Sequence, residues 1–170
     1  GMKCMDVGSG TGAVSLALAR IVAPTGRVVG VDTDTLLLDL AREKGAFPLF
    51  QAEAYLASGT MAGMDEDVRA AIRAHGIRNV TLQVGDAATG WDRQAPYDVI
   101  VVTGSLPVLP AGFRESLAVG GRLFVIVGES PVMEALLITR ISENDWAQES
   151  LFEIDLPPLV NAPRPQQFSL

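Results

Sequence analysis

Several residue types are scarce in this sequence of 170 residues, and each scarcity excludes a class of protein. Cys4 is the only cysteine, so no intramolecular disulfide can form, and this usage is typical of a cytoplasmic protein. His75 is the only histidine, and no cluster of metal-ligating residues accompanies it, so we expect no metal site. Every run of 18 residues contains a charge or a proline, and the start lacks a basic flank and a cleavage site. We therefore expect neither a membrane-spanning helix nor a secretory leader.

Basic residues are also few, because 13 Lys and Arg stand against 20 Asp and Glu, giving a net charge of −7. The arginines are scattered, whereas nucleic acids are bound through clusters of basic residues, so we expect no nucleic-acid partner. A hydrophobic fraction of 48% with a charged fraction of 19% indicates a globular chain. The length fits one domain over residues 2–170.

Apolar runs alternate with helical patterns along most of the chain. The expected strands are 2–7, 27–31, 79–84, 97–103 and 122–127, and the expected helices are 13–23, 36–44, 65–75 and 110–117. This alternation predicts an α/β fold with a doubly wound, mainly parallel, Rossmann-like sheet. Residues 135–141 and 150–156 flank a polar turn, which predicts an antiparallel C-terminal hairpin at one sheet edge. The prolines at 157, 158, 163 and 165 predict an extended tail.

Residues 46–76 are more than a simple strand–helix–strand connection needs, so we interpret them as a possible insertion or lid. Within them, 47–64 is apolar, including Phe47, Phe50 and Tyr55. Three interpretations stay open: an extra core helix with a loop, a lid over a ligand, or a surface for self-association. Because an exposed apolar patch of this size is a liability in a monomer, we hypothesise that 47–64 covers the sheet, within the chain or across a homo-oligomer.

The strongest functional signal is a glycine-rich turn between the first strand and the first helix. Its candidate cofactor-binding residues are Asp6, Gly8, Ser9, Gly10, Thr11 and Gly12. Such a turn brings backbone N–H groups against a ligand, and glycine allows a close approach. The spacing Gly8-x-Gly10-x-x-Ala13 fits a dinucleotide fingerprint, whereas Gly8-x-Gly10-x-Gly12 fits an S-adenosylmethionine loop equally well. In both cases Asp32, about twenty residues further on, accepts hydrogen bonds from a ribose.

Asp86 provides a second cofactor signal, because Gly85-Asp86-Ala87 directly follows the third expected strand. A carboxylate at the carboxyl edge of a parallel sheet can accept a hydrogen bond from an adenine amino group. The alternative interpretation is an ordinary turn residue.

Several motifs occur together in the second half of the chain. They are GDA at 85–87, GW at 90–91, APYDVIVVT at 95–103, GGRL at 120–123, VG at 127–128, LITR at 137–140 and LFE at 151–153. In combination they resemble the protein-L-isoaspartate O-methyltransferases. The resemblance covers most of the chain except roughly 46–75.

This resemblance implies an S-adenosyl-L-methionine-dependent enzyme that methylates the carboxylate of L-isoaspartyl residues in damaged proteins and releases S-adenosyl-L-homocysteine. It implies that the loop 8–12 holds the methionine end of the cofactor, Asp32 the ribose, and Asp86 with Ala87 the adenine. Thr33 is a further candidate for cofactor binding. Thr103, the candidate catalytic residue, and Gly104 are expected just past the fourth strand, facing the sulfonium and a protein or peptide substrate.

Two alternatives remain beside this interpretation. In the family, several dozen residues precede the first strand and help to hold the substrate, so cofactor binding carries over better than substrate choice. One alternative is therefore a cofactor-binding module, or a truncated methyltransferase, without independent catalysis. The other is a nicotinamide-dependent oxidoreductase, which the GDA motif at 85–87 and the lack of a Tyr-x-x-x-Lys relay disfavour.

Overall fold

The computed structural model describes residues 1–8, 13–32 and 79–165, which belong to two compact units. Unit 1 comprises residues 1–87 and unit 2 comprises residues 88–170. The predictions for 36–44, 65–75 and the apolar segment 47–64 lie outside the described residues. The single domain over 2–170 stays a prediction, and so does an insertion at 46–76.

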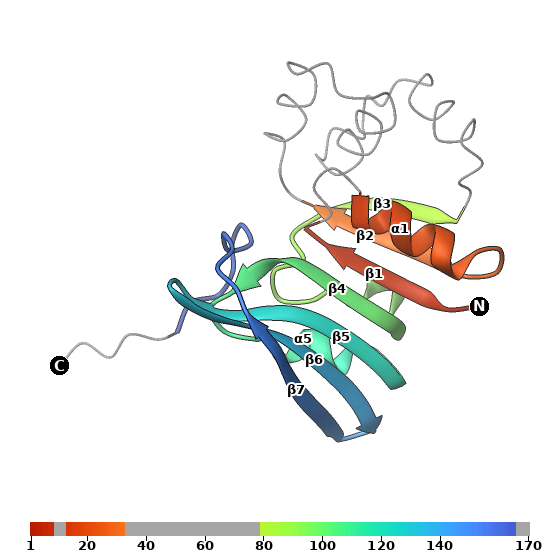
Figure 1. The fold of residues 1–170 in the computed structure, drawn as a ribbon. Helices are drawn as coiled ribbons and strands as arrows, with labels where there is room; N and C mark the ends of the chain where they lie inside the picture. Colours follow the sequence, from red (N-terminus) through yellow and green to blue (C-terminus); the bar gives the residue numbers. More distant parts are fainter. Residues whose placement is uncertain (9–12, 33–78, 166–170) are drawn as a thin grey trace, which may run out of the picture. The chain divides into compact units, whose positions relative to one another are not determined.

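Unit 1 is a parallel α/β unit (Figure 1). Its elements are β1 (Lys3–Val7), α1 (Ala13–Val22), β2 (Arg27–Asp32) and β3 (Val80–Val84). The strand order is β3-β2-β1, and both pairings are parallel. Parallel strands covered on both faces are apolar along their whole length, and Val28, Val29 and Val31 of β2 are all buried.

Helix α1 packs through one face, because Ser15, Ala19 and Val22 are buried at helical spacing. The side chain of Asn79 fastens the end of this helix to the strands. Its Nδ2 donates to the carbonyl oxygens of Ala19 at 2.8 Å and Gly26 at 3.0 Å. Cys4 on β1 is a free cysteine and is buried.

Unit 2 is mainly a β-unit with one short helix. Its elements are the 3-10 turn η2 (Asp92–Gln94), β4 (Tyr97–Leu106), α5 (Ala111–Glu115), β5 (Leu117–Glu129), β6 (Val132–Ser142) and β7 (Asp145–Glu153). The strand order is β4-β5-β6-β7, with β4 parallel to β5 and the later pairs antiparallel. The predicted C-terminal hairpin is confirmed as β6 and β7, with Ser142 opposite Asp145.

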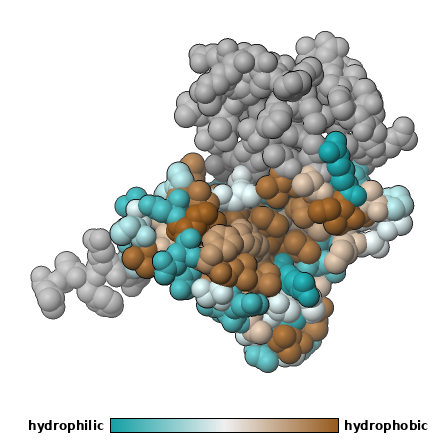
Figure 2. All heavy atoms as spheres, viewed as in Figure 1, coloured by the Kyte–Doolittle hydropathy of each residue, from teal (hydrophilic) through white to brown (hydrophobic). Residues whose placement is uncertain are grey.

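The core of unit 2 is formed by large side chains from its strands and from α5. Tyr97, Ile100, Phe113, Leu117 and Leu123 are each 0% exposed. Apolar side chains also gather on the face visible in Figure 2. Within the described residues, no helix is both long enough and apolar enough to cross a membrane.

Two predicted boundaries in unit 2 are wrong. The strand expected at 97–103 continues to Leu106, so Thr103 and Gly104 lie inside β4 and not just past it. The strand expected at 122–127 begins at Leu117, so Gly120 and Gly121 lie inside β5. In both places the β4–β5 register shifts, so the strands accommodate extra residues without ending.

Candidate functional site

The carboxyl ends of β1, β2 and β3 meet at one edge of unit 1. Val7 lies opposite Val31, and Asp32 lies opposite Val84. Because the three strands are parallel neighbours, Gly8, Asp32 and the Gly85-Asp86-Ala87 segment all stand at that edge. The structure therefore brings together the predicted cofactor-binding residues of unit 1 that it describes. Ser9, Gly10, Thr11, Gly12 and Thr33 lie outside the described residues.

Gly8 begins the turn after β1 in a conformation that requires glycine. Its φ is +73°, in the left-handed region that a Cβ disfavours. Its N–H donates to the carbonyl oxygen of Val31 at 2.9 Å, which ties the start of the turn to β2. Helix α1 begins five residues later at Ala13. Its N-terminal N–H groups favour negative charge or a hydrogen-bond acceptor.

Asp6 on β1 is buried. Its side chain is 0% exposed, and Oδ2 accepts a hydrogen bond from the Ser15 hydroxyl at 2.6 Å. Ser15 is itself buried on the first turns of α1. This charge-assisted bond joins β1 to α1.

Asp86 and Ala87, which follow β3, differ in exposure. Asp86 is exposed, so its carboxylate is accessible to a ligand, whereas Ala87 is 4% exposed. A small buried side chain next to an accessible acceptor can form the floor of a site for a flat ring.

Thr103 and Gly104 lie in the irregular part of β4, between the paired residues Val101 and Ser105. Thr103 is half-buried. A Cβ built on Gly104 would lie 2.7 Å from Cδ2 of Leu159, so a larger residue there would require the Leu159 side chain to shift. The close neighbour comes from residues 154–164, which follow β7 and which we call the C-terminal strap.

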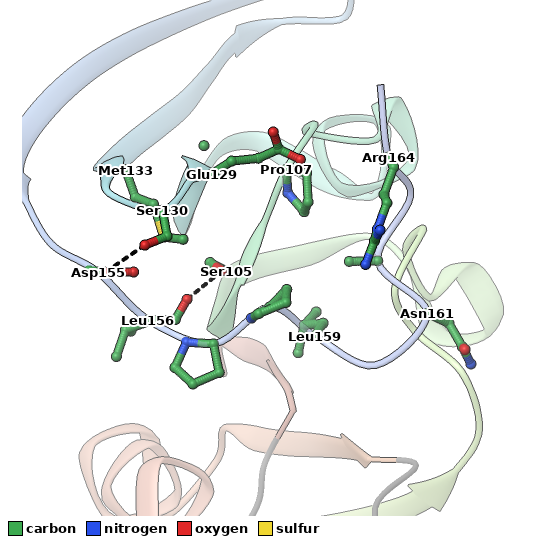
Figure 3. Close-up of a pocket in the computed structure, with 14 residues that line it drawn as sticks. Ser105, Pro107, Glu129, Ser130, Met133, Asp155, Leu156, Leu159, Asn161 and Arg164 are labelled. Carbon is green, nitrogen blue, oxygen red and sulfur yellow. Dashed lines mark hydrogen bonds between the residues drawn. The ribbon is translucent and has the colours of Figure 1, made fainter. Parts of the chain in front are cut away.

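The C-terminal strap forms one wall of a cavity of about 760 Å³ in unit 2 (Figure 3). The other walls come from the ends of β4 and β5 and the start of β6. The polar lining residues are Ser105, Glu129, Ser130, Asp155, Asn161 and Arg164. Sequence reasoning identified none of these six, and only the run of prolines marked the strap as an extended segment.

Metal ligation finds no support in the part of the chain that the structure describes. No group of three His, Cys, Asp or Glu side chains gathers there in a way that could hold a metal ion.

The family comparison gives a match over nearly the whole chain. A sequence model described as protein-L-isoaspartate(D-aspartate) O-methyltransferase (PCMT) matches residues 1–45 and 53–163. A protein-L-isoaspartate O-methyltransferase of Methanothermobacter thermautotrophicus is 28% identical over 161 residues, covering 94% of this chain and 62% of the relative. The chain thus spans less than two thirds of the length of that relative.

Two solved structures show the fold. A protein-L-isoaspartate O-methyltransferase superposes with a TM-score of 0.69 at 22% identity, covering 95% of this chain and 43% of the other. A Plasmodium falciparum protein described as a protein-L-isoaspartate O-methyltransferase, solved with S-adenosyl-L-homocysteine, gives a TM-score of 0.66 at 18% identity. That superposition covers 94% of this chain and 66% of the other. The predicted Rossmann-like methyltransferase fold is confirmed, and the chain belongs to the protein-L-isoaspartate(D-aspartate) O-methyltransferase family.

Proposed function

We propose that this chain binds S-adenosyl-L-methionine and transfers its methyl group to the carboxylate of L-isoaspartyl residues in damaged proteins. The observation that carries the proposal is the edge of unit 1, where Asp32 ends β2, and Gly8 and Asp86 follow its two parallel neighbours β1 and β3. Membership of the chain in the isoaspartyl methyltransferase family supports the same function. We place the protein in the cytoplasm, in agreement with its single, buried cysteine.

The donors and acceptors at this edge fit the cofactor. In our proposal the loop 8–12 binds the methionine end, because N–H groups at the start of α1 suit its carboxylate. Asp32, the last residue of β2, binds the ribose together with Thr33, and Asp86 with Ala87 binds the adenine. Family membership supports the remaining role, in which Thr103 and Gly104 of β4 contact the reacting end of the cofactor.

The chemistry asks mainly for positioning. The bound cofactor supplies a methyl group that is already electrophilic, since its sulfur carries a positive charge. An isoaspartyl carboxylate is ionised at neutral pH, so no residue needs to remove a proton from the nucleophile. The task of the protein is to hold the carboxylate in line with the methyl group, and such orientation contributes several kcal/mol.

Asp32 offers the direct test of cofactor binding. We expect Asp32→Ala to weaken S-adenosyl-L-homocysteine binding, measured by calorimetry, by about 1–3 kcal/mol, because ribose hydrogen bonds are left unmade. Glu149→Gln, which changes an exposed carboxylate on β7, is the matched control and should bind like the wild type. Equal affinity for all three proteins would show that the ribose is bound elsewhere.

The reaction itself is tested with a radiolabelled methyl donor and a pair of peptides that differ only in L-isoaspartate against L-aspartate. Methylation of the isoaspartyl peptide alone is expected. Cofactor binding without turnover would favour the alternative of a binding module or a truncated methyltransferase. Tight NAD binding without S-adenosyl-L-homocysteine binding would favour a nicotinamide-dependent oxidoreductase. A role of 47–64 in a homo-oligomer stays a hypothesis, which sedimentation of the wild type can test.

A further inference from the structure

The C-terminal strap is held on unit 2 by contacts along much of its length. At its start, Ile154 donates its N–H to the carbonyl oxygen of Met133 at 3.1 Å. Ile154 and Leu156 then pack against the buried cluster of Ile126, Met133 and Ala135. The strap continues to the end of β4, where Pro158 forms a parallel bridge with Ser105.

Ser105 makes three hydrogen bonds to the strap. Its N–H donates to the carbonyl oxygen of Pro157 at 3.0 Å, and its carbonyl oxygen accepts the N–H of Leu159 at 2.9 Å. Its hydroxyl donates to the carbonyl oxygen of Leu156 at 2.8 Å (Figure 3). The side chain is 0% exposed, so the hydroxyl is committed to this contact and not to solvent.

The prolines explain why a side-chain donor is needed here. Pro157 and Pro158 have no N–H, so the strap cannot form a regular ladder with β4 at these positions. The N–H of Ser105 is already used by Pro157, which leaves the carbonyl oxygen of Leu156 without a backbone donor from Ser105. The hydroxyl of Ser105 supplies that donor, so this side chain fixes the strap where its backbone cannot.

The fixed strap also seats Leu159 directly on Gly104. The side chain of Leu159 occupies the space that a Cβ on Gly104 would need. Gly104 precedes Ser105 on β4, and our proposed function places it at the reacting end of the cofactor. Because Ser105 bonds to the strap on both sides of Pro158, it also helps to position Leu159, which lines the cavity next to Gly104.

We propose that Ser105 is a positioning residue, which holds the C-terminal strap so that the cavity of about 760 Å³ accepts the peptide chain around the methylated carboxylate. The inference rests on the proposed function. The volume falls within the range of pockets that bind small ligands. The wall combines apolar surface from Met133, Leu156 and Leu159 with polar groups from Ser130 and Asp155, as suits a peptide segment.

The test compares Ser105→Ala with Ser130→Ala in the full chain. Ser130 lines the same cavity and also bonds to the strap, donating to Oδ2 of Asp155 at 2.9 Å, but it is exposed. We expect Ser105→Ala to speed amide hydrogen exchange in 157–164 about ten-fold, which is equivalent to about 1.4 kcal/mol. Exchange in β5 and β6 should not change, and the exchange rates of Ser130→Ala should match those of the wild type in 157–164.

A kinetic measurement separates positioning from simple stabilisation. We expect the KM for an isoaspartyl peptide to rise about five-fold or more in Ser105→Ala, with kcat and the Kd of S-adenosyl-L-homocysteine unchanged. If Ser105→Ala does not fold, Leu159→Ala loosens the strap without leaving a buried acceptor, and the same two results are expected of it.

The outcomes distinguish the two proposals. Unchanged exchange in the strap, or faster exchange with an unchanged KM in an active enzyme, overturns the role of Ser105 and leaves the proposed function standing. A wild-type protein that does not methylate the isoaspartyl peptide overturns the proposed function, and the positioning role with it.

Discussion

Arg140 on β6 holds the C-terminal hairpin against the segment that leads into β5. Its guanidinium donates to four backbone carbonyl oxygens. The acceptors are Glu115 at 3.1 Å, Leu117 at 2.5 Å, Ser142 at 3.2 Å and Glu143 at 2.7 Å. The same group lies 5.5 Å from the centroid of the Trp146 ring. One side chain thus joins the hairpin turn, the end of α5 and the start of β5.

The free energy at stake follows from these contacts. A hydrogen bond that involves a charged group contributes about 1.5–3 kcal/mol, and less where solvent competes. Only the bond to Leu117 is partly buried, so it carries most of the effect and the three exposed bonds add little. We expect Arg140→Ala to lower the free energy of unfolding by about 2–3 kcal/mol and the Tm by about 4–12 °C. Arg140→Lys should recover less than half, because an ammonium group cannot reproduce the planar fork.

Urea denaturation followed by far-UV circular dichroism measures this loss, and tryptophan fluorescence reports on the surroundings of Trp146. Arg114→Ala is the matched control, because Arg114 lies 5.9 Å from the same ring and tests the cation–π share alone. Its cost should stay below about 1 kcal/mol. An Arg140→Ala protein within about 0.5 kcal/mol of the wild type would refute the reasoning.

Three further predictions concern stability. Burial, with a smaller contribution from Asp92, raises the pKa of Tyr97 to about 12. The stability that the neutral Tyr97 side chain contributes is therefore complete below pH 10 and is lost as the pH rises toward 12. The wild type should lose about 2 kcal/mol in that window that Tyr97→Phe does not lose, and parallel pH profiles of unfolding would contradict this. A double-mutant cycle with Asp6→Asn and Ser15→Ala should give a coupling energy of about 1–2 kcal/mol, and a value near zero would mean that their bond does not hold β1 and α1 together. Asn79→Asp keeps the shape but removes the amide donor, so the urea midpoint should fall by the equivalent of about 1–2 kcal/mol, whereas an unchanged midpoint would argue against this link.

The elements of unit 1 that the structure describes could be predicted from the sequence within one residue. The strand expected at 27–31 is observed at Arg27–Asp32, and the helix expected at 13–23 is observed at Ala13–Val22. Parallel strands buried on both faces appear as continuous apolar runs, and Pro24 with Gly26 marks the end of the helix. Both signals are local, so one sequence was enough to find them.

The boundaries of β4 and β5 could not be predicted in the same way. Glycine disfavours the interior of a strand, so Gly104 and Gly121 suggest strand ends, but β4 continues to Leu106 and β5 begins at Leu117. What keeps β4 extended beyond Gly104 is pairing with Ile126 and with the strap, which joins at Pro158. Such tertiary pairing overrides the weak local preference of a glycine.

The candidate residues at the edge of unit 1 could be predicted from the sequence, whereas those lining the cavity of unit 2 could not, and the reason is again the difference between local and long-range contacts. The edge of unit 1 was predictable because parallel topology brings strand ends together, so residues that directly follow strands must be neighbours. The cavity of unit 2 depends instead on long-range contacts, such as the bond between Ser105 and Leu156, which are 51 residues apart, and the packing of Leu159 against Gly104. No local pattern encodes either contact. Under our two proposals, changes in the strap alter how the acceptor peptide is held, whereas the edge of unit 1, which local sequence specifies, keeps its affinity for the cofactor.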